Sequence, residues 1–271
     1  MELLERDWAL AKLDAAREAA AGGQGRVVLV TGEPGIGKTW LVRQFLADLD
    51  SSTKVLLGTC DDLSIPRPLG PIRDLAGSVS GALATALSEG AAPHEIQTLL
   101  IEELELPPSP TVLVLEDVHW ADDATFDAIT VLGRRIGSLP ALLILTFRAG
   151  EASPGHRLYS TIGSIRAEDT VMVELAPLSQ PAVAALAGEG ADKVYAVTRG
   201  NPFYVTELLA SRTASQLPAS VANAVLGRAA RLADPARRLV ELVSEFIQFS
   251  PTDLLAVTEA AIAKGMQKAA T

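Results

Sequence analysis

The stretch GEPGIGKT, residues 32–39, lies between the apolar run VVLV at 27–30 and a helical pattern that begins at Lys38. It matches the pattern G-x-x-x-x-G-K-[ST] at every fixed position. Glycines let backbone N–H groups approach phosphate oxygens, and a helix N-terminus adds a partial positive charge. The strand before it and the helix after it are the context that this pattern requires. A phosphate-binding loop is therefore favoured over a glycine-rich surface turn.

The residue types of this loop suit a nucleoside triphosphate with its metal ion. Lys38 can reach the β- and γ-phosphates, and the Thr39 hydroxyl can bind Mg²⁺. We expect the Lys38 side chain to be exposed and to take no part in core packing. The residues expected to bind the nucleotide are those of this stretch and the tryptophan directly after it: Gly32, Glu33, Pro34, Gly35, Ile36, Gly37, Lys38, Thr39 and Trp40.

Two acids end a second apolar run. The run TVLVLE at 111–116 closes with Glu116, and Asp117 follows it. Adjacent strand residues point to opposite faces, but where a strand ends the backbone bends and both carboxylates can reach one site. One acid would hold Mg²⁺ and the other would polarise the attacking water, and the sequence leaves open which does which. The alternative is a solvated acidic turn.

Other polar residues near these acids have weaker signals. The run LLILTFR ends with Thr146 and Arg148, where a polar group could lie beside the γ-phosphate. A surface arginine after a strand explains the same spacing equally well. His119 and Trp120, taken by themselves, favour packing roles, and Asp122 is expected to cap the next helix.

Five apolar runs alternate with helical patterns along the first part of the chain. This alternation predicts parallel strands joined by crossover helices, and hence a three-layer α/β domain. A helix is expected from residue 2 to about 21, and after Pro177 the pattern is all-helical. The expected strands lie at 27–30, 55–57, 111–116, 141–148 and 170–175.

Composition limits the classes of function. The chain has 271 residues, and 48% hydrophobic but only 4% aromatic residues predict an aliphatic core. A formal charge of −10 argues against broad attraction to nucleic acid or anionic lipid. Cys60 is the sole cysteine, which excludes an intrachain disulfide, and we expect it to be buried. With no signal peptide and no apolar run of about 20 residues, we expect a soluble, cytoplasmic protein without a membrane partner.

Five blocks of the sequence, in this order, resemble the ATPase module of large LuxR-type regulators. These regulators belong to the STAND class of P-loop ATPases, which is related to AAA+ proteins. The similarity extends from about Leu3 to Leu239. The blocks are GRVVLVTGEPGIGKTWLVRQFL (25–46), GTCDDLSIPRPLGPIRDLA (58–76), VLVLEDVHWADDATFDAI (112–129), LLILTFR (142–148) and RGNPFYVTELL (199–209).

The resemblance implies further properties of the fold and site. The P-loop NTPase sheet would have the strand order 5-1-4-3-2. Arg6 would lie near the adenine, Arg148 would be the sensor arginine, and Pro202 would pack near the base. For Pro202 the alternative is a plain helix start with Asn201 as its N-cap. The catalytic residues would be Lys38, Glu116, Asp117 and Arg148, and the Mg²⁺ ligands Thr39, Glu116 and Asp117.

The expected domains are a P-loop ATPase core at 1–176, a helical lid subdomain at 177–215 and a partial winged-helix segment at 216–271. Full-length members of the family continue to a C-terminal helix-turn-helix that binds DNA, and the recognisable pattern here ends at about Glu245. DNA binding is therefore not transferred to this chain. The late arginines Arg228, Arg231, Arg237 and Arg238 are expected not to give specific DNA binding alone.

The resemblance implies a signalling switch that binds ATP or ADP with Mg²⁺ and hydrolyses ATP slowly. Its nucleotide state would control conformation, self-assembly or contact with a protein partner. Two alternatives remain: a small-molecule phosphotransferase on the same loop, and a nucleotide-binding interaction module without turnover. ATP hydrolysis in the absence of an acceptor would distinguish the switch from the phosphotransferase.

Overall fold

A computed structural model describes residues 4–106, 110–148, 150 and 155–210 of the chain. Contacts divide the chain into two compact units. The first comprises Met1–Pro34 with Lys38–Leu175, and the second comprises Gly35–Gly37 with Ala176–Thr271. The expected winged-helix segment at 216–271 and its arginines lie outside the described residues.

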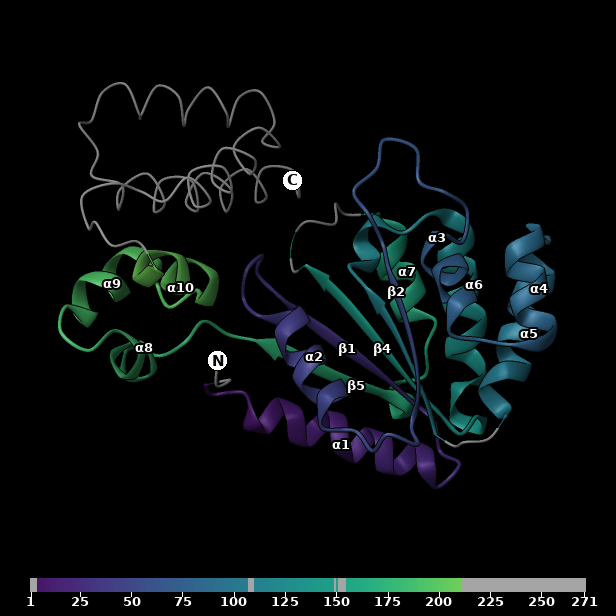
Figure 1. Cartoon of the computed structure of the whole chain (residues 1–271), viewed down its shortest axis with the longest axis horizontal. Coiled ribbons are helices and arrows are strands. Elements are labelled where there is room, and N and C mark those ends of the chain that lie inside the picture. The colour runs from purple at the N-terminus through teal and green to yellow at the C-terminus, as the bar shows by residue number, and fades with distance from the viewer. Residues whose placement is uncertain (1–3, 107–109, 149, 151–154, 211–271) are drawn as a thin grey trace. The chain divides into compact units, whose positions relative to one another are not determined.

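A parallel five-stranded sheet forms the centre of the first unit, with the order β2-β3-β4-β1-β5 (Figure 1). This is the expected order 5-1-4-3-2 written from the other edge, so the P-loop NTPase fold class is confirmed. Parallel pairing requires a crossover between paired strands, and the intervening helices supply it. The strands are β1 (Arg26–Gly32), β2 (Lys54–Thr59), β3 (Thr111–Glu116), β4 (Ala141–Arg148) and β5 (Thr170–Leu175).

Helices cover both faces of this sheet, as the alternation of buried residues requires. Val27 and Leu29 of β1 belong to one apolar cluster, together with residues of α3 to α6. Val28 and Val30 are also fully buried but lie on the opposite face, and α1 contacts β1, β4 and β5. The helices of this unit are α1 (Asp7–Ala21), α2 (Lys38–Ala47), α3 (Gly70–Arg73), α4 (Gly81–Glu89), α5 (Pro93–Glu105), α6 (Asp123–Arg135) and α7 (Arg157–Gly163).

The N-terminal helix begins later than the sequence pattern predicts. It was expected from residue 2, whereas α1 starts at Asp7. Glu5 has a φ of +56° and Arg6 has φ −120° and ψ 0°, so neither has helical backbone geometry. The apolar periodicity that suggested an earlier start is continuous with α1, but the backbone turns before it.

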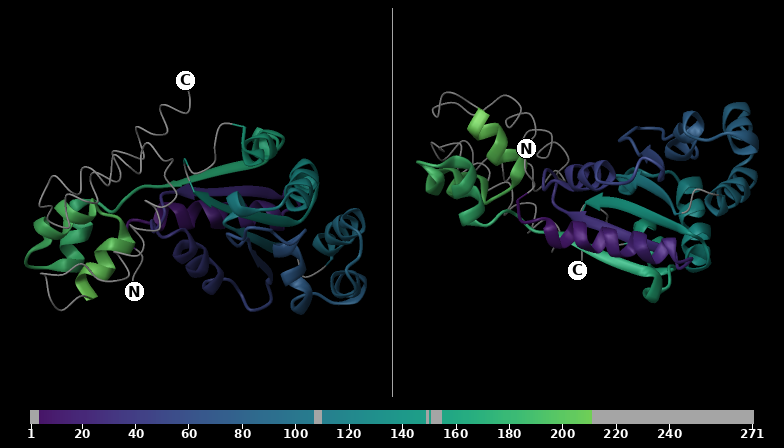
Figure 2. Two further views of the ribbon diagram at one scale, coloured as in Figure 1. Left: turned by 90° about the horizontal axis from the view of Figure 1, so that it is seen from above. Right: turned by 60° about the horizontal axis from the view of Figure 1, so that its bottom comes forward.

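The described residues of the second unit form the short helices α8 (Gln180–Ala187), α9 (Ala191–Thr198) and α10 (Pro202–Ala210), drawn in green in Figure 2. The backbone N–H of Leu178 donates to the carbonyl oxygen of Gly200 over 2.8 Å, which joins the start of this unit to the turn before α10. Asn201 Oδ1 accepts from the N–H of Phe203 over 3.2 Å, and α10 begins at Pro202, as the alternative of a plain helix start describes.

Across the described part of the chain, every helix is too short or too polar to cross a lipid bilayer.

We predict that Gly58→Ala destabilises the fold by about 2 kcal/mol, the scale of overpacking a filled core. A Cβ at Gly58 in β2 would lie 2.1 Å from the carbonyl oxygen of Pro71, and backbone cannot yield as a flexible side chain can. Gly77→Ala is the matched control, because a Cβ there meets no atom within 4 Å. Urea unfolding of both variants checks this, and equal midpoints would contradict it.

Candidate nucleotide-binding site

The glycine-rich loop joins the end of β1 to the start of α2, as the sequence predicts. Gly37 has a φ of +99°, a backbone conformation that an L-residue with a side chain rarely adopts. Lys38 is the first residue of α2, and Thr39 and Trp40 follow it in the first helical turn. Trp40 is 51% exposed, and Ile36 is fully buried.

The expectation that Lys38 is exposed was wrong. Its side chain is buried, and Nζ donates to the carbonyl oxygens of Gly32 and Glu33, each over 3.0 Å. An ammonium group loses less solvation free energy when carbonyl oxygens replace its water, so the lysine folds inward onto its own loop. The charge is thus held within the loop instead of extending into solvent.

The two acids lie at the carboxyl end of β3 but in different environments. Glu116 is the last residue of β3 and is buried, and its Oε1 has no hydrogen-bond partner among the described residues. Asp117 is half-buried and has left-handed backbone geometry, with φ +53° and ψ 43°. Its N–H donates to Thr146 Oγ1 on β4 over 2.9 Å. This left-handed backbone bends the chain directly after β3, so the consecutive residues Glu116 and Asp117 can both lie at the carboxyl edge of the sheet.

A short turn after the acids, Val118–Trp120, brings an aromatic pair to the same edge. The N–H of Trp120 donates to the carbonyl oxygen of Asp117 over 2.9 Å and closes this turn. His119 is buried, and its Nδ1 lies 3.8 Å from Asp117 Oδ1. The guanidinium carbon of Arg148 lies 5.9 Å from the Trp120 ring centroid. Packing, the role expected of His119 and Trp120, therefore describes only part of their contacts, because His119 also lies near Asp117 and Trp120 near Arg148.

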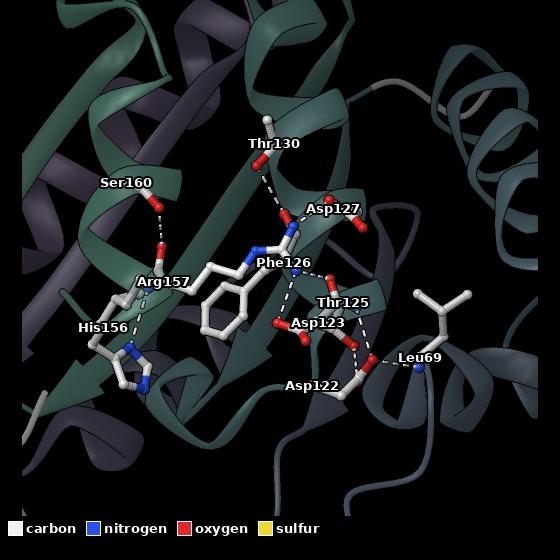
Figure 3. Close-up of polar contacts among 11 residues, drawn as sticks. Leu69, Asp122, Asp123, Thr125, Phe126, Asp127, Thr130, His156, Arg157 and Ser160 are labelled. Carbon is white, nitrogen blue, oxygen red and sulfur yellow. Dashed lines mark hydrogen bonds and ion pairs between the residues drawn. The ribbon is translucent and has the colours of Figure 1, made fainter.

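Asp122 does more than cap α6, the role that the sequence predicts and the structure confirms. Its Oδ1 accepts from the N–H of Thr125 over 3.0 Å and from the N–H of Leu69 over 3.1 Å (Figure 3). The N–H of Cys60 donates to the carbonyl oxygen of Glu116 over 2.9 Å. Both ends of the segment between β2 and α3 are thus hydrogen-bonded to residues at or beside the acids. The bonded residues lie more than 50 positions apart in the sequence, so no local sequence signal predicts these contacts.

Figure 3 also shows a surface ion-pair group on α6 and α7. Arg157 donates to Asp123 Oδ1 over 2.8 Å and pairs with Asp127, one helical turn further along α6. His156 Nδ1 accepts from the N–H of Leu158 and so caps α7. These contacts join the two helices and lie outside the set of residues expected to bind nucleotide.

The remaining predicted residues are Arg6 and Pro202. Arg6 is buried and precedes α1, and burial lowers the pKa of its guanidinium, against a smaller opposing effect of Glu5. Figure 1 shows the N-terminal end of α1 on the same side as the carboxyl end of β5. Pro202 is the first residue of α10 in the second unit.

The donor set of the first unit fits Mg²⁺. Thr39, Glu116 and Asp117 offer only oxygen atoms, which this hard cation prefers, and the buried Glu116 Oε1 is an acceptor without a donor among the described residues. No group of three or more His, Cys, Asp or Glu side chains suited to a metal occurs in that part of the chain. Mg²⁺ commonly uses one or two carboxylates with phosphate oxygens and water, so a sparse set suffices.

Cys60 lies at the end of β2, beside these acids. Burial raises the pKa of its thiol to about 12, and the carboxylates of Asp122 and Asp117 add to the shift. A buried cysteine was expected and is confirmed. Its raised pKa shows that the surroundings disfavour further negative charge.

A glycine-rich loop between a buried strand and a helix, with acids ending a nearby parallel strand, defines a P-loop NTPase. The profile of the AAA ATPase domain matches residues 2–145. The chain belongs to the AAA ATPase domain family.

Solved structures support the fold. The Walker-type ATPase of Pyrococcus abyssi superposes with a TM-score of 0.61 at 16% identity, covering 97% of this chain and 90% of that one. Cdc6p of Pyrobaculum aerophilum gives a TM-score of 0.50 at 17% identity, covering 71% and 50% of the two chains. An uncharacterized protein of Rhizobium meliloti (strain 1021) is 27% identical over 194 residues. That match covers 56% of this chain and 19% of the relative, so the chain spans only a fraction of that protein's length.

We predict that a disulfide reagent modifies Cys60 of the folded protein at pH 8 about 10³-fold more slowly than in urea. Thiolate is the reactive form, and a pKa near 12 leaves far less of it than an ordinary thiol has. The single cysteine makes the absorbance change unambiguous. If the rates in the folded protein and in urea differ by less than tenfold, the Cys60 thiol is accessible and its pKa is close to that of an ordinary cysteine.

Proposed function

We propose that this chain binds ATP with Mg²⁺ and hydrolyses it slowly, as the switch module of a LuxR-type regulator. The observation that carries the proposal is the meeting of three features at one sheet edge. The Lys38 ammonium lies in the loop after β1, Glu116 and Asp117 end β3, and Arg148 ends β4 between these two strands.

Several residues of the chain would contact different parts of the bound nucleotide. Lys38 would exchange the carbonyl oxygens it now contacts for β- and γ-phosphate oxygens, which are stronger, charged acceptors. Backbone N–H groups of residues 32–39 and the N-terminus of α2 would contact the remaining phosphate oxygens. Trp40, Arg6 and Pro202 are proposed to lie near the nucleoside. Bound Mg²⁺ would offset charge on the β- and γ-phosphates.

The different environments of the two acids favour different roles. Glu116, with its buried acceptor oxygen, is the proposed Mg²⁺ ligand together with Thr39. Asp117 is half-buried and next to His119, so it can meet a water molecule, and we assign it the role of general base. Arg148 would stabilise charge that develops on the γ-phosphate.

Acceptor-free turnover distinguishes this function from a phosphotransferase. A phosphotransferase protects its phosphoryl group until an acceptor binds, whereas a switch must transfer it to water. An acid pair that ends a strand, with one acid proposed to activate water, supports the switch. Its ATP and ADP states are proposed to differ in conformation and in assembly with a partner or a second copy.

The first test is phosphate release from Mg·ATP by the purified chain without an acceptor, with particle mass measured in ATP and in ADP. We expect slow release and a difference in mass or hydrodynamic radius. Lys38→Ala should weaken ATP binding by roughly 10- to 100-fold, the value of a lost charge-assisted hydrogen bond. Lys193→Ala, an exposed lysine of α9, is the control.

Because Lys38 also holds two loop carbonyls, the melting temperature of Lys38→Ala is measured alongside its binding. An ATP affinity within twofold of the wild type would refute the assignment of this loop. Turnover that requires an added small-molecule acceptor would favour the phosphotransferase, and binding without any turnover would favour the interaction module.

The second test separates the acids. Asp117→Asn should retain most ATP binding but slow hydrolysis by ~10²-fold or more, the effect of losing a positioned base. Glu116→Gln should instead raise the Mg²⁺ concentration needed for half-maximal turnover. Asp123→Asn, whose side chain is 87% exposed, is the matched control. Exchanged phenotypes would reverse the two roles, and mild, equal effects would mean that the pair is not catalytic.

A further inference from the structure

We infer that Trp120 is a positioning residue, whose indole face holds the Arg148 guanidinium and links this arginine to the turn that carries Asp117. The inference rests on the proposed ATP turnover at the same edge. It assigns a role to a residue that the sequence alone places in packing.

The distance between the two groups supports an attractive contact. The Arg148 guanidinium carbon lies 5.9 Å from the Trp120 ring centroid, within the range of cation–π attraction, and tryptophan is the strongest partner ring. Arg148 and Trp120 are both half-buried, so solvent screens the contact less than it would on an open surface. A planar guanidinium can stack on an indole and still direct N–H groups elsewhere.

The ring is held firmly enough to act as a support. Trp120 packs against the main apolar cluster, and its ring centroid lies 4.8 Å from that of His119. Its N–H bond to the carbonyl oxygen of Asp117 fixes the backbone of the turn. A side chain restrained by core, neighbour and backbone loses little further freedom when it holds Arg148.

Two contacts join β4 to this turn. Thr146 accepts from the N–H of Asp117 at the start of the turn, and Arg148 lies on Trp120 at its end. Thr146 and Arg148 are two residues apart on one strand and therefore project from the same face. The arginine and the proposed base are thus both in contact with one short turn, and a displacement of Arg148 would disturb its contact with Trp120.

A double-mutant cycle tests this coupling in the full chain. Trp120→Leu removes the ring and should lower kcat about fivefold to thirtyfold with KM changed less than twofold, whereas Trp120→Phe should lose about threefold or less. Arg148→Met should lose about 10²-fold. The Trp120→Leu, Arg148→Met double variant should be within about twofold of Arg148→Met, because Trp120 acts through that arginine. Trp8→Phe is the control for loss of an exposed indole.

Losses that add in the double variant would overturn the inference, and so would a Trp120→Leu effect confined to KM or to the melting temperature. A spectroscopic arm does not depend on turnover. The chain is labelled with 5-fluorotryptophan, and the fluorine resonance of Trp120 is identified by its loss in Trp120→Phe. In nucleotide-free protein this resonance should shift in Arg148→Met and stay in place in Arg134→Met, an exposed arginine of α6.

Adding Mg·ATP should shift the Trp120 resonance in the wild type, and Arg148→Met should lose most of that shift. An unchanged resonance in nucleotide-free Arg148→Met would show that the contact does not exist, and a full ATP-dependent shift in Arg148→Met would show that Arg148 does not transmit it. Failure of the proposed function looks different. Then ATP changes no resonance at all, while the nucleotide-free comparison still reports the contact.

Discussion

The parallel register of β4, with β1 on one side and β3 on the other, determines which side chains of the first unit can meet. In this register Val30 lies beside Thr146 and Gly32 beside Arg148, while Leu115 lies beside Leu145 just before the acids. Because parallel strands end at the same edge, the loop after β1, the arginine of β4 and the acids of β3 are gathered there. A slip of one residue would turn Thr146 and Arg148 to the other face and bury the wrong side chains.

Two non-glycine residues near this edge have left-handed backbones, and each is held by a side-chain oxygen from another element. Asp117 has a φ of +53° and donates its N–H to Thr146 Oγ1, and Leu69 has a φ of +56° and donates to Asp122 Oδ1. This conformation is unfavourable, more so for leucine than for aspartate. Each hydrogen bond offsets part of that cost, so the turns beside the acids depend on contacts with β4 and α6.

The sequence predicts the elements of this fold better than it predicts their contacts. Apolar runs identify all five strands, because a strand buried on both faces reads as a continuous apolar segment. Strand order does not follow from such runs, and here it was implied by family resemblance. The inward fold of Lys38 and the start of α1 at Asp7 were missed, since both depend on backbone conformation that residue periodicity does not encode. The role inferred for Trp120 was missed because its partner, Arg148, lies on β4, far from Trp120 in the sequence.

The negative charge at the sheet edge that carries Glu116 and Asp117 explains why the proposed mechanism includes a metal ion. Burial is the largest cause of the raised pKa of Cys60, and the carboxylates of Asp122, Asp117, Asp61 and Asp74 raise it further. The negative potential at this edge therefore comes from more groups than Glu116 and Asp117. A triphosphate approaching this edge alone would meet repulsion from those groups. Lys38 and Arg148 together supply two positive charges, fewer than the negative charges of a triphosphate and the two acids combined. A divalent cation held by Glu116 and Thr39 would offset part of this excess negative charge. We therefore expect the affinity of the proposed site for ATP to rise with Mg²⁺ concentration, because Lys38 and Arg148 do not balance the negative charge by themselves.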